Sequence, residues 1–249
     1  MSVTEPHILA SLQPLDRRRL HELVLTQLLI AIQSGHLKQG ERLPELEIAE
    51  RLSLSRGTVR EAIRRLEQAG LVVSQPHRGA FITQLSPEDA REIFSLRRLL
   101  EAFAVRLAVA RVTEEALSEL ETLTKVMVDL SERGKRIERV RIDLQFHERL
   151  CLLSGHRHLH QVWYGLALKL WLVYFDPRSR QGPDVVGRAA SHFELIEHLR
   201  RGEAEEAVSW IERHIGERGE RALDELSTTP VVSNTSETSE VTNAESRRD

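Results

Sequence analysis

The stretch RLPELEIAERLSLSRGTVREAIRRL, residues 42–66, decides the fold of the first part of the chain. Pro44 suits the start of a helix, and Ser55 is a good N-cap for the next one. Apolar side chains recur at helical spacing in both segments, at Leu46, Ala49 and Leu52 and then at Val59, Ile63 and Leu66. A short turn at 53–55 separates them. The stretch therefore predicts a helix-turn-helix, with helices over 45–52 and 55–69.

The flanking sequence completes a winged helix-turn-helix. A helix is expected between Asp16, a fair N-cap, and Gly35. Its inward stripe would be Leu20, Leu23, Val24, Leu28 and Ala31. After Gly70, two β-prone runs at 71–73 and 80–82 flank the turn-forming residues 74–79. The residues up to 83 therefore predict three helices plus a β-hairpin.

The pattern is helical from Ser86-Pro87 onward, and an all-α antiparallel bundle is expected. Its predicted helices are 87–110, 113–131, 136–154, 158–174, 186–201 and 204–225. The predicted fold class is thus mostly α. The predicted parts are a flexible arm (1–14), a winged helix-turn-helix domain (15–84), a helical domain (85–226) and a disordered tail (227–249). Ser and Thr fill ten of the 23 positions of that tail.

Composition narrows the class of protein. The 249 residues include one cysteine, Cys151, so an internal disulfide is excluded and a reducing compartment is expected. Residues 1–15 lack the apolar core of a signal peptide, and no run is long enough for a membrane span, so we expect a cytoplasmic protein. Six arginines between positions 51 and 78 face only two glutamates, which suits contact with phosphates. The net charge of −3 argues against a non-specific DNA-packaging protein.

The start of the third predicted helix carries side chains that can read DNA. Arginine can bond guanine O6 and N7 together, and threonine can bond a phosphate or touch a thymine methyl group. Because the N-terminal residues of such a helix lie nearest the bases, we expect contacts from Arg56, Gly57, Thr58 and Arg60. The hairpin tip, His77-Arg78-Gly79, would form the wing. The alternative is a winged helix that serves protein contacts only.

Residues 42–66, together with Gly70-Leu-Val and Gly79-Ala-Phe-Ile, closely resemble the winged helix of the GntR family. The resemblance implies DNA contacts at Arg42, Ser55, Arg56, Thr58, Arg60, His77 and Gly79. Glu45 departs from the family pattern, which often has Ser after the proline. The family implies a transcriptional regulator, most often a repressor. A homodimer is expected, since two-fold proteins read palindromic operators with recognition helices about 34 Å apart.

The helical part resembles the effector domain of the FadR subfamily, the FCD domain, and its length favours the six-helix, VanR-like branch. The signatures in order are Arg97-Arg-Leu-Leu-Glu101, Asp143-Leu-Gln-Phe-His147, Leu150, Ser154-Gly155, His192 in SHFELIE and His214 in ERHI. Each signature is loose alone. Together, in this order and behind this winged helix, they are specific.

The chemistry of four of these residues also predicts a metal site. Asp143 and His147 lie on one helical face, with Phe146 and Leu150 beside them. His192 and His214 likewise share their faces with apolar residues, so all four would point into the bundle. A lone buried histidine is more simply a hydrogen-bonded core residue, but one carboxylate and three imidazoles together suit a divalent metal: zinc first, with nickel, manganese or iron possible. The resemblance implies the same four ligands, with a small carboxylate effector completing the coordination.

Other candidates carry less weight. Arg97 could pair with the effector carboxylate or form an ordinary surface ion pair. His156, His158 and His160 are expected to be exposed to solvent, and Trp163, Trp171 and Trp210 to form core or pocket walls. The alternative function is a metal-dependent hydrolytic enzyme that uses the same four residues. Because the sequence offers no separate general base or nucleophile motif, we expect a regulator and not an enzyme.

Overall fold

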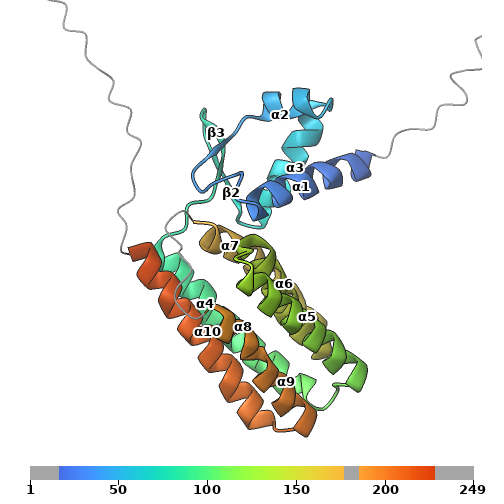
Figure 1. Ribbon diagram of the computed structural model, residues 1–249. Coiled ribbons are helices and arrows are strands. Elements are labelled where there is room, and N and C mark those ends of the chain that lie inside the picture. Colours follow the sequence, from blue (N-terminus) through green and yellow to red (C-terminus); the bar gives the residue numbers. More distant parts are fainter. Residues whose placement is uncertain (1–16, 177–184, 228–249) are drawn as a thin grey trace, which may run out of the picture.

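The computed structural model describes residues 17–176 and 185–227, and the predicted arm at 1–14 and nearly all of the predicted tail lie outside these ranges. The described chain has two parts, a small α/β part and a helical bundle (Figure 1). The first part contains α1 (Arg17–Gln33), β1 (Arg42–Leu43), α2 (Glu45–Arg51), α3 (Arg56–Gln68), β2 (Val72–Gln75) and β3 (Gly79–Ile82). The predicted winged helix-turn-helix fold is confirmed.

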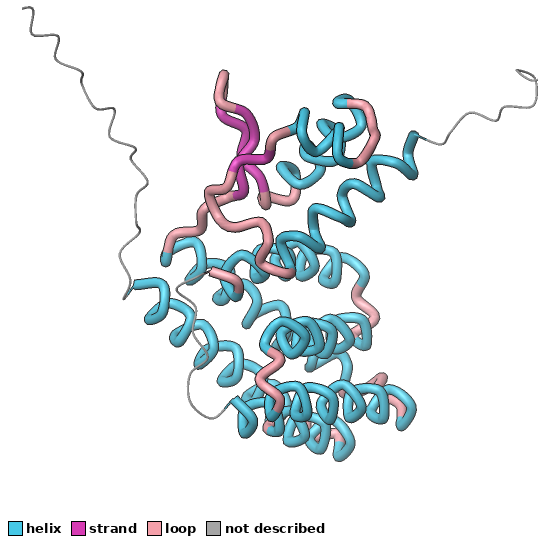
Figure 2. The backbone as a smooth tube through the Cα atoms, turned by 45° about the horizontal axis from the view of Figure 1, so that its top comes forward, coloured by secondary structure: helices cyan, strands magenta, loops and turns pink. Residues whose placement is uncertain are grey.

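The sheet contains one strand more than the predicted hairpin. β2 and β3 pair antiparallel, and the two-residue strand β1 pairs with the other edge of β3, where Arg42 lies opposite Phe81. Figure 2 shows that the described strands are confined to this part of the molecule. β1 was not predicted because two residues are too few to show an alternating pattern.

Some apolar positions of the winged helix face outward, contrary to prediction. Leu23, Leu46 and Leu52 are exposed at 60%, 51% and 38%. Val24, Leu28 and Ile32 carry the buried face of α1, and Ala49 is the buried residue of α2. The prediction was right for α3, whose Val59, Ile63 and Leu66 are all buried. The spacing fixed the helices, but it could not fix which side of a leucine-rich helix meets the core.

The second part of the chain is a bundle of helices, as predicted. Its segments are α4 (Pro87–Ala108), α5 (Glu114–Glu132), α6 (Arg136–Leu153), α7 (Arg157–Tyr174), α8 (Val185–Ala190), α9 (His192–Arg201) and α10 (Ala204–Ser227). α10 packs along α4, and α5 along α6. The predicted helix 186–201 is divided at Ser191 into α8 and α9, so the described bundle has seven helical segments where six were expected. None of the helices in the described ranges has the length and apolarity of a membrane span.

Candidate functional site

Three helices of the bundle bring the four predicted metal ligands together. Asp143 and His147 lie one turn apart on α6, His192 begins α9, and His214 lies on α10. One ligand atom from each of the four residues lies within 4.8 Å of the others. The imidazole rings of His192 and His214 have their centroids 4.7 Å apart, and those of His147 and His214 are 5.3 Å apart. Residues from distant parts of the sequence therefore form one cluster.

The ligand atoms of this cluster lack hydrogen-bond partners among the described residues. They are Asp143 Oδ2, His147 Nε2, His192 Nε2 and His214 Nε2, and all four are buried. Buried polar atoms in native proteins are nearly always paired, because leaving one unpaired costs about 1–3 kcal/mol. Four such atoms converging on one point, from an acid and three imidazoles, fit a divalent cation with three or four protein ligands.

Hydrogen bonds to Nδ1, the ring nitrogen that faces away from the cluster, orient the imidazoles of His147 and His192. His147 Nδ1 lies 2.6 Å from Glu101 Oε2, and His192 Nδ1 lies 3.1 Å from the carbonyl oxygen of Ala189. In each ring the Nδ1–H can donate to this acceptor, which leaves the lone pair of Nε2 facing the cluster. A carboxylate behind a histidine ligand is the usual way to fix its tautomer.

Glu101 makes three hydrogen bonds in the outer layer, which consists of the residues that surround the four ligands and orient them. Its Oε1 accepts hydrogen bonds from Arg97 Nε at 2.5 Å and from Trp163 Nε1 at 2.7 Å, while Oε2 faces His147. Burial alone would raise the pKa of Glu101, but the Arg97 guanidinium and His147 outweigh it and lower the pKa to about 2. Glu101 is therefore ionised, and it ties α4 to α6 and α7.

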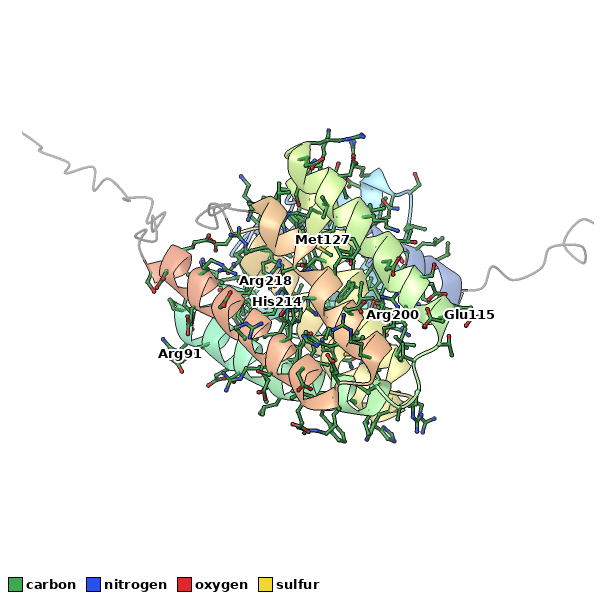
Figure 3. The ribbon with its side chains drawn as sticks, turned by 60° about the horizontal axis from the view of Figure 1, so that its bottom comes forward. Arg91, Glu115, Met127, Arg200, His214 and Arg218 are labelled. Atoms are coloured by element: carbon green, nitrogen blue, oxygen red, sulfur yellow. The ribbon has the colours of Figure 1, made fainter. Side chains whose placement is uncertain are left out.

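The buried Arg97 and the half-buried Arg218 lie beside the cluster. Arg218 donates from Nη1 to Asp143 Oδ1 at 2.9 Å and from Nε to the hydroxyl of Tyr174, also at 2.9 Å. Arg97 donates to the same hydroxyl at 3.0 Å, and its Nη2 is buried without a partner among the described residues. Figure 3 shows Arg218 and His214 on α10, close together within the bundle. This side of the cluster presents guanidinium groups that suit a carboxylate.

The charge states of the cluster favour a cation. Burial would raise the pKa of Asp143, but Arg218 and the neighbouring histidines hold it far below its ordinary value. Burial lowers the pKa of His192 to about 4, and burial with the neighbouring His192 and His147 holds the pKa of His214 well below 6.5. At neutral pH the cluster therefore offers an anionic oxygen and at least two neutral imidazoles, the forms in which these groups bind metals.

A surface pocket of about 210 Å³ leads toward the cluster at His214. Its lining residues are Gly187, Arg188, Ser191, Glu194, Trp210, Arg213, His214 and Glu217. The indole of Trp210 stacks on the imidazole of His214, with centroids 4.6 Å apart and planes within 14°. His214 is the half-buried member of the four, whereas the other three are buried. A ligand from solvent would therefore meet the cluster first at His214.

The predicted DNA-contact residues at the start of α3 are available to a duplex. Arg56, Gly57 and Arg60 are exposed. Ser55 caps the helix, because its Oγ accepts a hydrogen bond from the backbone nitrogen of Thr58 at 3.1 Å. The hydroxyls of these two residues are also hydrogen-bonded to each other, at 2.8 Å. The exposed N-terminus of α3 thus carries side chains and backbone dipoles of the kinds that can bind phosphates and bases.

The predicted wing lies at the turn between β2 and β3. His77, Arg78 and Gly79 are all exposed, and His77 and Gly79 have positive φ angles of 61° and 99°. The Arg42 side chain lies against this turn, since a Cβ built on Gly79 would be 3.5 Å from Arg42 Nε. The hairpin tip points away from the helical bundle (Figure 1). All nine predicted contact residues thus lie on α3, just before it, on β1 or β3, or in the turn between β2 and β3.

The roles of Glu101, Arg218 and Tyr174 at this cluster were not predicted from the sequence. Two signals were present: Glu101 is four residues from Arg97, and Arg218 is four residues from His214, so each pair shares a helical face. Arg97 itself is buried in an ion pair with Glu101, not in the surface pair considered above. His156 and His158 are exposed, while His160 is half-buried and contacts Glu148. Trp163, Trp171 and Trp210 are buried as expected.

Family models and similar proteins agree on the class of protein to which the chain is similar, the bacterial transcriptional regulators. The family model described as "FCD domain" matches residues 92–217, and the one described as "Bacterial regulatory proteins, gntR family" matches residues 20–82. The HTH-type transcriptional regulator YdhC of Bacillus subtilis is 37% identical over 134 residues, covering 53% of this chain and 60% of that protein. The HTH-type transcriptional repressor NanR of Cronobacter sakazakii is 26% identical over 226 residues, covering 82% of this chain and 85% of that protein.

Among solved structures, the chain is similar to McbR/YncC of Escherichia coli, with a TM-score of 0.74 and 22% sequence identity. The match covers 83% of this chain and 98% of that one. At this level of identity the likeness establishes the shared fold, from the winged helix through the helical bundle.

Proposed function

The chain belongs to the GntR family of bacterial regulatory proteins with an FCD domain, and on this premise we propose that it is an operator-binding repressor controlled by a small carboxylate and a divalent metal ion. One observation carries the ligand part of the proposal: four buried ligand atoms, without partners among the described residues, converge beside the buried Arg97 and the half-buried Arg218. An ion would satisfy the four atoms, and the arginines would neutralise a carboxylate that completes its coordination.

The DNA-binding part rests on the exposed N-terminus of α3. Arg56 and Arg60 would read base edges in the major groove, Ser55 and Thr58 would contact the backbone, and the wing and Arg42 would hold the flanking groove. A palindromic operator needs two copies of this module. Exposed apolar side chains on one face of α4 support a homodimer through the helical part, namely Leu96, Leu99 and Phe103.

The metal ion proposed for the cluster is zinc, with nickel, manganese and iron as alternatives. It would be held by Asp143, His147, His192 and His214, and it would act as an electrophilic anchor for one end of the effector. Arg97 and Arg218 would pair with the carboxylate that completes the coordination of the ion. The remaining chain fixes the ligands: Glu101 orients His147, and the carbonyl of Ala189 orients His192.

Control of DNA binding requires the ligand to change the energy of one arrangement of the two parts relative to another. The end of α7 supports such a link. The hydroxyl of Tyr174 accepts hydrogen bonds from both arginines of the pocket, and Asp176 follows directly after this helix. Gln39, in the loop before β1, donates hydrogen bonds to Asp176 and to the carbonyl of Leu172. An effector that drew Arg97 and Arg218 toward itself would therefore move Tyr174 and the end of α7. That movement would change the contacts of Gln39, which join the winged helix to the helical bundle.

The hydrolytic enzyme considered above is not the function we propose, because the similar proteins are named as transcriptional regulators. Operator DNA lies in the bacterial cytoplasm, so the proposal implies a cytoplasmic protein.

The decisive experiment selects duplexes from a random pool with the full-length protein and then measures binding to the selected site with and without metal and with a series of carboxylates. We expect a palindromic site, and we expect an effect of carboxylate that requires metal. Equal binding to every duplex would refute sequence-specific recognition. A carboxylate effect that persists after chelation, or turnover of a metal-activated substrate with no effect on DNA binding, would refute the ligand part.

A further inference from the structure

A contact between the two helices of the helix-turn-helix involves Arg60, one of the residues that should read DNA. Arg60 of α3 donates from Nε and from Nη2 to the same oxygen, Glu45 Oε2 of α2, at 3.2 and 3.1 Å. The side chain of Arg60 is 64% exposed, whereas that of Glu45 is only 24% exposed. The carboxylate is thus partly fixed in the protein surface, and the guanidinium projects from it.

The other arginines of α3 are arranged differently. Arg64 and Arg65 pair with Glu61 on their own helix. Arg56 has no ion pair among the residues that the structure describes. Arg60 is therefore the arginine of this helix that is joined to α2. An exposed ion pair contributes at most about 1 kcal/mol to stability, so holding the fold together is a poor explanation for this contact.

From this geometry we infer that Glu45 is a positioning residue that sets how Arg60 reads the operator, an inference that rests on the proposed function. Glu45 occupies the edge of the guanidinium formed by Nε and Nη2. Nη1 makes no contact with Glu45, and the side chain is 64% exposed, so the edge formed by Nη1 and Nη2 is left for DNA. Two parallel donors on one edge match O6 and N7 of a guanine. Holding the side chain in advance removes part of the entropy that Arg60 would otherwise lose on binding.

The charge of Glu45 gives the contact a second effect. A carboxylate near the DNA surface repels the phosphates of every sequence alike. At the operator this repulsion is offset by the guanine contact that Glu45 positions, and at other sequences it is not. Glu45 should therefore increase the ratio of the affinity for the operator to the affinity for unrelated DNA, rather than raise the affinity for all DNA.

The test compares Glu45→Ala with Glu47→Ala in the full-length protein. Glu47 is an exposed glutamate in the same first turn of α2, so it matches the change in charge without contacting Arg60. Binding is measured to the duplex selected from a random pool and to an unrelated duplex of equal length. For Glu45→Ala we expect a loss on the order of tenfold at the operator, with unrelated binding unchanged or tighter, and a relaxed base preference at one position of each half-site. Glu47→Ala should keep the wild-type ratio.

Three further variants separate positioning from charge. Arg60→Ala should already lack the preference, and adding Glu45→Ala to it should cost nothing more. Glu45→Gln, which keeps an oxygen acceptor but removes the charge, should retain more of the base preference than Glu45→Ala, and melting curves check that both variants are folded. Equal ratios in Glu45→Ala and Glu47→Ala, or equal preferences in Glu45→Gln and Glu45→Ala, would overturn the inference. If the wild type shows no preference for any duplex, the proposed function itself fails.

Discussion

Gln39 donates a hydrogen bond from Nε2 to Oδ2 of Asp176 at 2.9 Å, and this contact joins the winged helix to the end of α7. The same nitrogen donates to the carbonyl of Leu172, and Gln39 Oε1 accepts from the backbone nitrogen of Leu85 at 2.7 Å. One amide side chain thus connects the loop before β1, the segment that leads into α4 and the helix that carries Tyr174. A substitution of this one residue would therefore weaken the contact between the winged helix and the helical bundle.

Replacing Gln39 with Met should weaken the coupling between effector binding in the helical bundle and DNA binding by the winged helix. The methionine fills similar space but makes none of the three hydrogen bonds. We expect operator affinity without effector to stay within about threefold of wild type, while the change in affinity caused by effector shrinks by about 1 kcal/mol or more. Titration of operator binding with and without effector measures both quantities. Gln27→Met, at an exposed position of α1, is the control. Full effector response in Gln39→Met would argue against a link through this residue.

Arg56→Ala should weaken operator binding by about 1–3 kcal/mol, because the first exposed arginine of α3 would lose its contact with a base edge. Fluorescence anisotropy with the selected duplex measures the loss. Arg51→Ala removes an equally exposed arginine from the end of α2 and should have a smaller effect. Equal operator binding by wild type and Arg56→Ala would show that the contact is assigned to the wrong residue.

His192→Ala should lower the metal content of the purified protein, since it removes one of the three imidazoles of the cluster. Elemental analysis after dialysis against the metal gives the stoichiometry. His158→Ala changes an exposed histidine outside the cluster and serves as the control. An unchanged metal content in His192→Ala would remove the proposed site.

Glu101→Gln should weaken metal binding about 10- to 100-fold without removing a ligand, because His147 loses the carboxylate that orients its ring. The variant should also melt at a lower temperature, since Arg97 would be left buried without its counter-charge. Competition with a chelator at a temperature where the variant is folded separates the two effects. Glu148→Gln, which alters the partner of the half-buried His160, is the control. Wild-type metal affinity in Glu101→Gln would contradict the role assigned to this carboxylate.

The metal-free protein should lose stability as the pH falls from about 6.5 toward 4. The pKa of His192 is lowered to about 4 by burial, so in this range the unfolded chain binds a proton that the folded chain does not. Stability must then rise with pH across the window, and His214, whose pKa is shifted in the same direction, adds to the effect. Thermal melts at several pH values measure the slope. His192→Gln should flatten it, and an unchanged slope would mean that other groups cause the acid sensitivity.

The sequence predicted most of the fold and the inner residues of the site. Helical spacing and caps located the helices of the winged helix. For the candidate site, the apolar neighbours of Asp143, His147, His192 and His214 predicted that all four side chains would point into the bundle. The outer layer was not predictable in the same way. Tyr174 and Arg218 lie on different helices, and their hydrogen bond depends on how α7 and α10 pack, which no local pattern encodes.

The errors have a common physical origin. Leu23, Leu46 and Leu52 fit a helical stripe, but whether such a stripe is covered depends on neighbours far along the chain. The division of the predicted helix 186–201 at Ser191 has a similar cause. His192 points its Nδ1 at the carbonyl of Ala189 there, an arrangement that serves the cluster and not the local helix preference.

The unpartnered atoms at the centre of the bundle have a consequence beyond gene control. Without an ion, the fold must keep a carboxylate oxygen and three imidazole nitrogens buried, with no hydrogen-bond partner in the described part of the chain. Occupancy would clamp α6, α9 and α10 to one another, so cellular proteases should degrade the empty protein faster than the loaded one. If the proposed site binds the ion, scarcity of the ion would then lower the amount of this regulator in the cell as well as weaken its response to effector.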